Sequence, residues 1–336
     1  MGPSSNSSAQ WCARLGTALL WAAMALSGAD FPQAVIGNGA IRAKLYLPNP
    51  QSGYYRATRF DWSGQIPSLE FQGHSFFGQW FEKYDPKIHD AIMGPVEEFL
   101  TNGAGLGYAE AKTGESFVKI GVGALRKPAE RAFQQFHTYE IADSGKWRVH
   151  TGRGFVEFTH VLGDTNGYAY VYRKTVRLAA GRPVMVLEHS LKNTGRKTIQ
   201  STVYAHNFYM LDNQPAGPDY VVRFPWNVRA MADLNGLAET RGTELVYLRE
   251  LQKGESVFSA LKGFGPDARD YEIRVENRKA GIGVKQTADR PIARMNFWSI
   301  RSTVCPEAFI DMRIEPGGAF TWNITYEFYT LPQHTQ

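Results

Sequence analysis

One segment, Thr198–Phe208, has the composition of a strand and carries a histidine that could transfer protons. Side chains alternate between the two faces of a strand, so one polar face is predicted from Gln200, Thr202, Tyr204 and His206. Histidine titrates near neutral pH and can act as a general acid or base. Asn207 and the polar loop that begins at Asp212 follow directly, and both are predicted to contact a ligand. The alternative for His206 is an inert, hydrogen-bonded core histidine.

A second group of polar and charged residues alternates with aromatic residues in the segment 54–99. Such a mixture suits a sugar, which offers hydroxyl edges and apolar C–H patches, and a planar guanidinium would suit the carboxylate of a uronate. The residues predicted to bind a substrate here are Arg59, Asp61, His89 and Glu97. For Arg59 and Asp61 the alternative is an ordinary surface ion pair. The carboxylates near His89 permit a metal site, but the segment shows no tight metal-ligand spacing, so no metal is assigned.

The elements that must position these residues are predicted to be β-strands. Period-two alternation of apolar and polar residues is clearest in 168–178 and 320–329. Turn-forming residues recur about every ten positions, as in a chain of many short strands. Only 75–84 and 129–136 could form a short turn or helix, and a βαβ rhythm is missing. The prediction is all-β: a single-domain, large antiparallel β-sandwich over residues 30–336.

Residues 1–29 have the layout of a secretory signal peptide. Arg14 precedes the apolar run 15–26, and small residues follow at 27–29. That run is shorter than the roughly 20 residues of a membrane-spanning helix, although an uncleaved anchor is the alternative. We therefore expect a secreted or periplasmic chain without a membrane span after cleavage. Removing Cys12 with the signal leaves Cys305, which is predicted to be a small buried hydrophobe.

The charge distribution argues against a nucleic-acid partner. The 37 Lys and Arg residues are scattered along the chain and exceed the 32 Asp and Glu residues only slightly. A nucleic-acid-binding protein would usually concentrate its cations in a stripe or patch. The weak positive charge is compatible with an anionic glycan. The expected partner is a mono- or oligosaccharide, and the oligomeric state is not predicted.

The order of motifs in the second half resembles the galactose mutarotase-like (aldose 1-epimerase-like) superfamily. A strand at 184–191, an Asn-Thr-Gly turn at 193–195 and a second strand that ends in His206 look like the central hairpin of that family. The resemblance covers residues 165–330. It implies a supersandwich fold, a carbohydrate ligand and a role for His206 in acting on the sugar.

The C-terminus is also similar to this family, because a Pro-Gly-Gly turn at 316–318 leads into an aromatic-rich final strand. In the family the catalytic carboxylate lies on or near the strand before that turn, which makes Glu307 and Glu315 the candidates. Glu307 is preferred, since Glu315 is too close to the turn to point into a cleft. The family's mutarotases carry another histidine upstream, for which His89 and His74 are the options.

Interconverting sugar anomers requires a base for the proton of the anomeric hydroxyl and an acid for the ring oxygen. The resemblance therefore implies Glu307 as base and His206 as acid. The leading hypothesis is an exported aldose 1-epimerase-like isomerase that needs no cofactor. A cleft with the two groups about 5–7 Å apart would favour such acid–base chemistry.

Two other functions remain open, because one fold can carry several functions. A lyase or related glycoside-active enzyme would abstract the proton beside a uronate carboxylate. A non-catalytic carbohydrate-binding protein would instead present an open aromatic platform without the pair of catalytic groups. Four tryptophans are predicted to be core residues rather than such platforms: Trp62, Trp80, Trp226 and Trp298.

Overall fold

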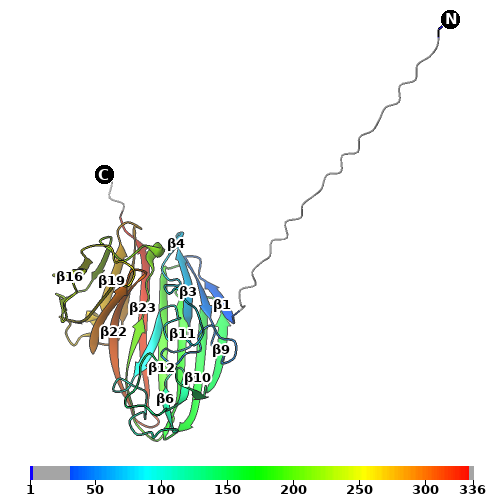
Figure 1. Ribbon diagram of the computed structural model, residues 1–336, viewed down its shortest axis with the longest axis vertical. Coiled ribbons are helices and arrows are strands. Elements are labelled where there is room, and N and C mark those ends of the chain that lie inside the picture. The colour runs from blue at the N-terminus through cyan, green and yellow to red at the C-terminus, as the bar shows by residue number, and fades with distance from the viewer. Residues whose placement is uncertain (3–30, 333–336) are drawn as a thin grey trace. The chain divides into compact units, whose positions relative to one another are not determined.

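The computed structural model describes residues 1–2 and 31–332 (Figure 1). In this part of the chain it contains 23 strands and two short 3-10 helices, η1 (Leu211–Asn213) and η2 (Ala268–Asp270). The predicted all-β class is therefore confirmed. No helix within these residues has the length and apolarity needed to cross a membrane. Apart from its first two residues, the predicted signal peptide lies outside the described part, and so does Cys12.

Two large antiparallel sheets form the sandwich. The ten-stranded sheet contains, in spatial order, β16 (Ala238–Arg241), β17 (Glu244–Tyr247), β14 (Tyr220–Arg223), β19 (Glu272–Asn277), β20 (Ile282–Ala288), β23 (Ala319–Thr330), β12 (Val184–Asn193), β11 (Tyr168–Leu178), β10 (Phe155–Thr165) and β9 (Lys146–Gly152). The six-stranded sheet contains β15 (Arg229–Ala230), β18 (Ser256–Lys262), β21 (Arg294–Ile300), β22 (Thr303–Ile314), β13 (Ile199–His206) and β5 (Val96–Leu100).

Two smaller sheets come from the first half of the chain. One consists of β1 (Gln33–Gly37), β2 (Ile41–Tyr46), β3 (Gln65–Phe71) and β4 (His74–Ser75). The other consists of β6 (Ser116–Lys119), β7 (Gly123–Arg126) and β8 (Ile141–Asp143). Apolar residues of both, such as Leu69 and Val118, join the same buried cluster as the two large sheets.

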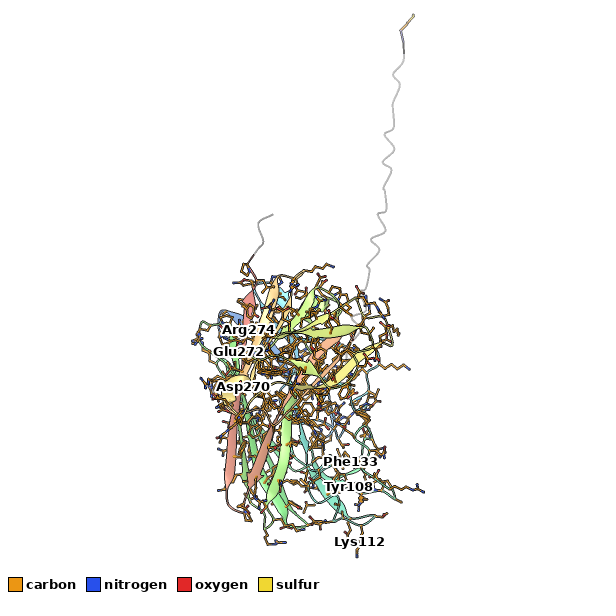
Figure 2. All side chains as sticks on the ribbon, turned by 90° about the vertical axis from the view of Figure 1, so that its left-hand side faces the viewer. Tyr108, Lys112, Phe133, Asp270, Glu272 and Arg274 are labelled. Atoms are coloured by element: carbon orange, nitrogen blue, oxygen red, sulfur yellow. The ribbon has the colours of Figure 1, made fainter. Side chains whose placement is uncertain are left out.

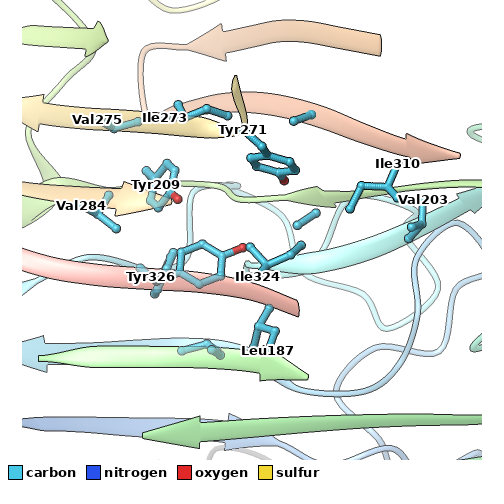
Figure 3. Close-up of a cluster of buried hydrophobic side chains, with 14 of the residues drawn as sticks. Leu187, Val203, Tyr209, Tyr271, Ile273, Val275, Val284, Ile310, Ile324 and Tyr326 are labelled. Atoms are coloured by element: carbon cyan, nitrogen blue, oxygen red, sulfur yellow. The ribbon is translucent and has the colours of Figure 1, made fainter. Parts of the chain in front are cut away.

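Apolar and aromatic side chains from the two large sheets meet in the core (Figure 3). Tyr209 and Tyr326 lie there beside aliphatic residues of both sheets. The tyrosine hydroxyls have partners: that of Tyr209 donates to the Gln286 side chain at 3.1 Å, and that of Tyr326 donates to Asn207 at 2.9 Å. The large rings can therefore be fully buried without an unsatisfied polar group. Cys305 is also fully buried, as predicted.

Period-two alternation located the long strands well. The segment 168–178 is β11, and 320–329 lies within β23. In β11 the side chains of Tyr170 and Tyr172 are buried while Arg173 and Arg177 are exposed, as the alternation predicts. The segment 129–136 contains turns and bends and the segment 75–84 a single bend, and neither contains a helix.

Aromatic packing holds the segment 129–136 in place without a helix. The Phe133 ring meets that of Tyr108 edge to face, with 5.3 Å between ring centres, and stacks on Tyr139 at 5.2 Å. The hydroxyls of Tyr108 and Tyr139 both donate to Glu130, at 2.7 and 2.9 Å. Figure 2 shows Tyr108 and Phe133 close to one another, away from Asp270, Glu272 and Arg274 of the β19 region. These contacts fix the backbone that presents the next residues, 135 and 136.

The central hairpin expected from the resemblance is not a hairpin. Strand β12 belongs to the ten-stranded sheet and β13 to the six-stranded sheet, so the turn at 193–195 crosses between sheets. The turn at 316–318 does the same between β22 and β23. The two turns are joined, since the Asn193 amide donates to the Gly318 carbonyl at 2.9 Å and the Gly317 amide donates to the Asn193 carbonyl at 3.0 Å. This double crossover places β13 and β22 side by side.

Candidate functional site

A cavity of about 610 Å³ lies on the six-stranded sheet, on the face opposite to the core. The core-facing residues of β13 and β22 include Val203 and Ile310, and the alternate residues face the cavity. Loop residues such as Trp80, Asp90 and Phe136 close its sides. The strands supply Thr202, Tyr204, His206, Arg294, Asn296, Trp298, Glu307 and Phe309. The polar face predicted for the segment 198–208 is thus the floor of a cavity.

His206 and Glu307 are in direct contact in this cavity. Strand β13 pairs with β22 with Tyr204 opposite Phe309, and two residues further along His206 reaches Glu307. The imidazole Nε2 lies 3.2 Å from the Glu307 Oε1. Both residues are buried, with 3% and 6% of their surfaces exposed. The pair predicted from two distant segments therefore meets, at a shorter distance than the 5–7 Å expected.

Aromatic rings fix the orientation of the imidazole. The His206 ring stacks on Phe208 at 3.8 Å, and Phe208 stacks in turn on Trp80 at 4.8 Å. Phe208 has a φ of 47°, a left-handed conformation that non-glycine residues seldom adopt. This backbone reversal turns the ring back onto His206. The imidazole Nδ1 is buried without a hydrogen-bond partner among the described residues, so its Nε2 side, next to Glu307, is the side available for chemistry.

The surroundings shift the pKa values of the pair in opposite directions. Burial raises the pKa of Glu307 to about 7; Arg59 opposes the shift and Glu98 supports it. Burial lowers the pKa of His206 well below its usual value, Arg59 lowers it further, and Asp90 opposes this. Each shift favours the uncharged form of the group. The neutral pair, with a carboxylic acid beside a neutral imidazole, is therefore favoured over imidazolium and carboxylate.

Arg59, in the same cavity, lies in a network of buried charge. Its Nε donates to Glu98 at 2.9 Å, it forms an ion pair with Asp90, and its Nη2 lies 3.3 Å from the Tyr204 hydroxyl. The Tyr204 hydroxyl donates to Glu98 at 2.6 Å. Gln135 donates to both oxygens of Glu98 at 3.0 and 3.1 Å. Arg59, one of the residues predicted to bind a substrate, lines the cavity, but two carboxylates already engage its charge.

Two predicted substrate-binding residues lie in the sandwich interior instead of at the cavity. Glu97 pairs with Lys174 and lies 3.0 Å from the Nε2 of His189. Burial acts to raise the pKa of Glu97, but Lys174 and His189 outweigh it and the pKa falls below its usual value. Asp61 accepts a hydrogen bond from the Tyr172 hydroxyl at 3.1 Å, and burial raises its pKa to about 7. Because Asp61 and Glu97 are fully enclosed, they are not part of the candidate site.

Asn207 and Asp212 also lie outside the cavity lining. Asn207 is buried, and its side-chain amide donates to the Pro306 carbonyl at 2.8 Å, which ties β13 to β22. Asp212 accepts from the Ser75 amide at 2.8 Å and lies 2.7 Å from the Nδ1 of His74. Both side chains are therefore occupied in holding the fold.

Of the two upstream histidines, His89 lies nearer the site. Its Nε2 is 2.9 Å from Asp90, and its ring packs against Phe136 at 5.1 Å. Both Asp90 and Phe136 line the cavity, whereas His74 contacts Asp212 elsewhere. His89 thus belongs to the wall behind the cavity rather than to its lining.

Several cavity residues were not singled out from the sequence. Trp80 and Trp298 line the cavity, although they were predicted to be core residues. Arg294 and Asn296 come from β21, and the register places Asn296 directly opposite Glu307. Alternation in the segment 294–300 could have predicted their shared face. Which strand would lie beside Glu307 could not be read from the sequence.

Comparison with known proteins supports the fold. No protein-family model and no curated protein matches the sequence. One similar solved structure is a galactose mutarotase related enzyme from Lactobacillus acidophilus, with 14% identity and a TM-score of 0.55, covering 90% of this chain and 99% of that chain. A galactose mutarotase-like protein from Lactobacillus casei has 12% identity and a TM-score of 0.55, covering 88% of this chain and 100% of that chain. An aldose epimerase homologue from C. elegans has 12% identity and a TM-score of 0.53, covering 89% of this chain and 99% of that chain.

The similarity extends over almost the whole length of these structures, at identities that establish the fold alone. The structural similarity agrees with the order of motifs at residues 165–330. It also extends to the first half of the chain, where the sequence showed no specific motif of the family. The chain has the fold of the galactose mutarotase-like superfamily.

Proposed function

We propose that this protein interconverts the anomers of a sugar, with His206 and Glu307 as the acid–base pair. The observation that carries the proposal is the 3.2 Å contact between the imidazole and the carboxyl group on the floor of a cavity. Acid–base catalysis needs two such groups within hydrogen-bond reach of the protons that move. The aldose epimerase-like names of structures with the same fold point to the same chemistry.

The pair needs one exchangeable proton to complete the reaction. The acid donates it to the ring oxygen as the bond between that oxygen and the anomeric carbon breaks. The base takes the proton of the anomeric hydroxyl, which becomes the aldehyde oxygen. Rotation about the bond between C1 and C2 presents the other face of the aldehyde, and the reverse transfers close the ring. Atoms and charge balance, and no cofactor is required.

The residue that holds the exchangeable proton at the start differs from the one assigned in the sequence analysis. His206 as acid and Glu307 as base would require an imidazolium at the start. The buried surroundings favour the proton on Glu307 instead. We therefore propose that ring opening begins with Glu307 as the acid and neutral His206 as the base. The transfer then generates an ion pair within contact distance, which stabilises both products of the proton transfer.

The cavity also offers what a sugar ring needs for binding. The rings of Trp80 and Trp298 can face its C–H patches, while the Asn296 side chain lines the cavity and can meet its hydroxyl groups. A site that combines apolar walls with a few placed polar groups is typical for small ligands.

Export is a second part of the proposal, supported by the signal-like layout of residues 1–29. The test is cell fractionation of a C-terminally tagged chain, with sequencing of its N-terminus. An exported chain that begins near residue 30 is expected. A full-length chain retained in the cytoplasm would contradict export.

The function is tested by following fresh α-anomers of hexoses by polarimetry with protein that starts at residue 30. Faster mutarotation, lost in His206→Asn and Glu307→Gln, is expected. Uronate-containing glycans followed by ultraviolet absorbance form the parallel arm. New unsaturated products without mutarotation would point to a lyase. Glycan binding without either reaction would leave a binding protein.

A further inference from the structure

Arg294 is a cation in the cavity without a carboxylate partner. It lines the cavity and is exposed, and its guanidinium lies over the Phe309 ring, 3.8 Å from the ring centre. Within residues 1–2 and 31–332 it forms no ion pair and donates no side-chain hydrogen bond. Arg177 and Arg249, which lie outside the cavity lining, are instead paired with glutamates. A cavity cation without a partner is available to a ligand.

The other arginine of the cavity cannot serve an anionic ligand in the same way. Arg59 is 9% exposed and engages both Glu98 and Asp90. An anion placed there would meet two carboxylates and be repelled. The electrostatic potential in the cavity is therefore asymmetric: the carboxylates of Glu98 and Asp90 offset the charge of Arg59, whereas the charge of Arg294 is not offset by a carboxylate of the described residues.

Strand geometry puts Arg294 within reach of a sugar bound at the catalytic pair. In the β21–β22 register Arg294 lies opposite Phe309, and Asn296 lies opposite Glu307. Arg294 and Asn296 lie on the same face of β21, two residues apart, so their backbone positions are separated by roughly 7 Å. The charge of Arg294 acts on Glu307 in the direction that lowers its pKa. One sugar ring can bridge these positions.

We infer that the preferred substrate is an acidic sugar whose single negative charge is bound by Arg294 while its anomeric centre lies at His206 and Glu307. This inference rests on the proposed function for the position of the anomeric centre. A single guanidinium matches a monoanion, and its planar fork can bind two oxygens of one carboxylate or sulfate group. Stacking on Phe309 keeps the guanidinium plane in place before the ligand arrives.

The test compares the binding of galactose, galacturonate and galactose 6-sulfate to the wild type by NMR titration. Binding is measured separately from mutarotation, so the two proposals can fail independently. Arg294→Met keeps the apolar stem on Phe309 and removes the charge, and Arg294→Lys keeps the charge without the planar fork. Arg269→Met is the control, because Arg269 is exposed, pairs with Asp267 and does not line the cavity.

The expected result is that at least one acidic sugar binds the wild type about tenfold more tightly than galactose. That preference should disappear in Arg294→Met, weaken in Arg294→Lys and persist in Arg269→Met. Preference for galacturonate identifies a uronate substrate, and preference for the sulfate identifies a sulfated sugar; either supports the inference.

Equal binding of neutral and acidic sugars, or a preference that survives in Arg294→Met, overturns the inference even if mutarotation is observed. Binding of acidic sugars that depends on Arg294, without any mutarotation, upholds the charge preference and refutes the catalytic proposal. Failure of all three sugars to bind overturns the inference, and mutarotation of the other hexoses then decides the catalytic proposal.

Discussion

The carboxylates of Glu97 and Glu98 are neighbours in the sequence but lie on opposite sides of the six-stranded sheet. Glu97 points into the sandwich interior and pairs with Lys174, while Glu98 points to the cavity side and holds Arg59. Both are fully buried. The alternation of a strand therefore separates a structural charge from one that acts on the candidate site.

Lys174→Met should destabilise the protein strongly, because it leaves Glu97 as a buried carboxylate beside His189 without its main cation. The expected loss is about 3–5 kcal/mol in the free energy of unfolding, measured by urea denaturation. The control is Arg177→Met on the same strand, whose exposed pair with Glu188 is worth less than about 1 kcal/mol. Similar losses in the two variants would argue against a structural role for the Lys174–Glu97 pair.

Glu307→Gln should change stability in a pH-dependent way. The folded-state pKa of Glu307 is raised from 4.5 to about 7, so its contribution to stability is fully present below pH 4.5 and is lost as the pH rises through 7. Above that pH the wild type carries a buried carboxylate that the variant lacks. The free energy of unfolding of Glu307→Gln, relative to that of the wild type, should therefore rise by on the order of 3 kcal/mol between pH 4.5 and pH 8. A difference that does not vary with pH, measured by denaturation at both values, would show that Glu307 titrates normally.

Glu98→Gln should shift the pH dependence of mutarotation. His206 and Glu307 can catalyse mutarotation only while they hold one exchangeable proton between them. Activity is therefore expected to fall as the pH rises through about 7, where Glu307 loses its proton. The charge of Glu98 raises the pKa of Glu307, and its removal should move this decline to lower pH. Tyr204→Phe, which removes the hydrogen bond to Glu98 but keeps the charge, is the matched control. An unmoved decline in Glu98→Gln would mean that another group sets it.

The sequence predicted those features that depend on local alternation. The strands around Tyr170 and Trp322 and the polar face that ends in His206 follow from the period of two. Glu307 was reached through the resemblance, from its position before the C-terminal turn. His206 could therefore be named from the alternation of its own strand, whereas Glu307 could be named only from its position before the C-terminal turn.

What the sequence could not supply was the pairing of distant segments. Lys174 falls on the inward face of β11 by alternation, but its partner Glu97 comes from a strand of the other sheet, far away in sequence. The crossover at Asn193 has the same turn residues as a hairpin, so local signals did not distinguish the two. Trp80 and Trp298 looked like core residues because a large aromatic side chain gives no sign of which side of a sheet it will cover.

The central claim is that His206 and Glu307 act as one acid–base unit on the anomeric centre. Its most direct test is NMR exchange spectroscopy of α- and β-anomers with wild type, His206→Asn, Glu307→Gln and the double variant. Each single variant should lose about 100-fold or more of the catalysed rate, and the double variant should lose little beyond that, because the groups work together. Catalysed exchange that survives in either single variant, or losses that simply multiply in the double variant, would contradict the account.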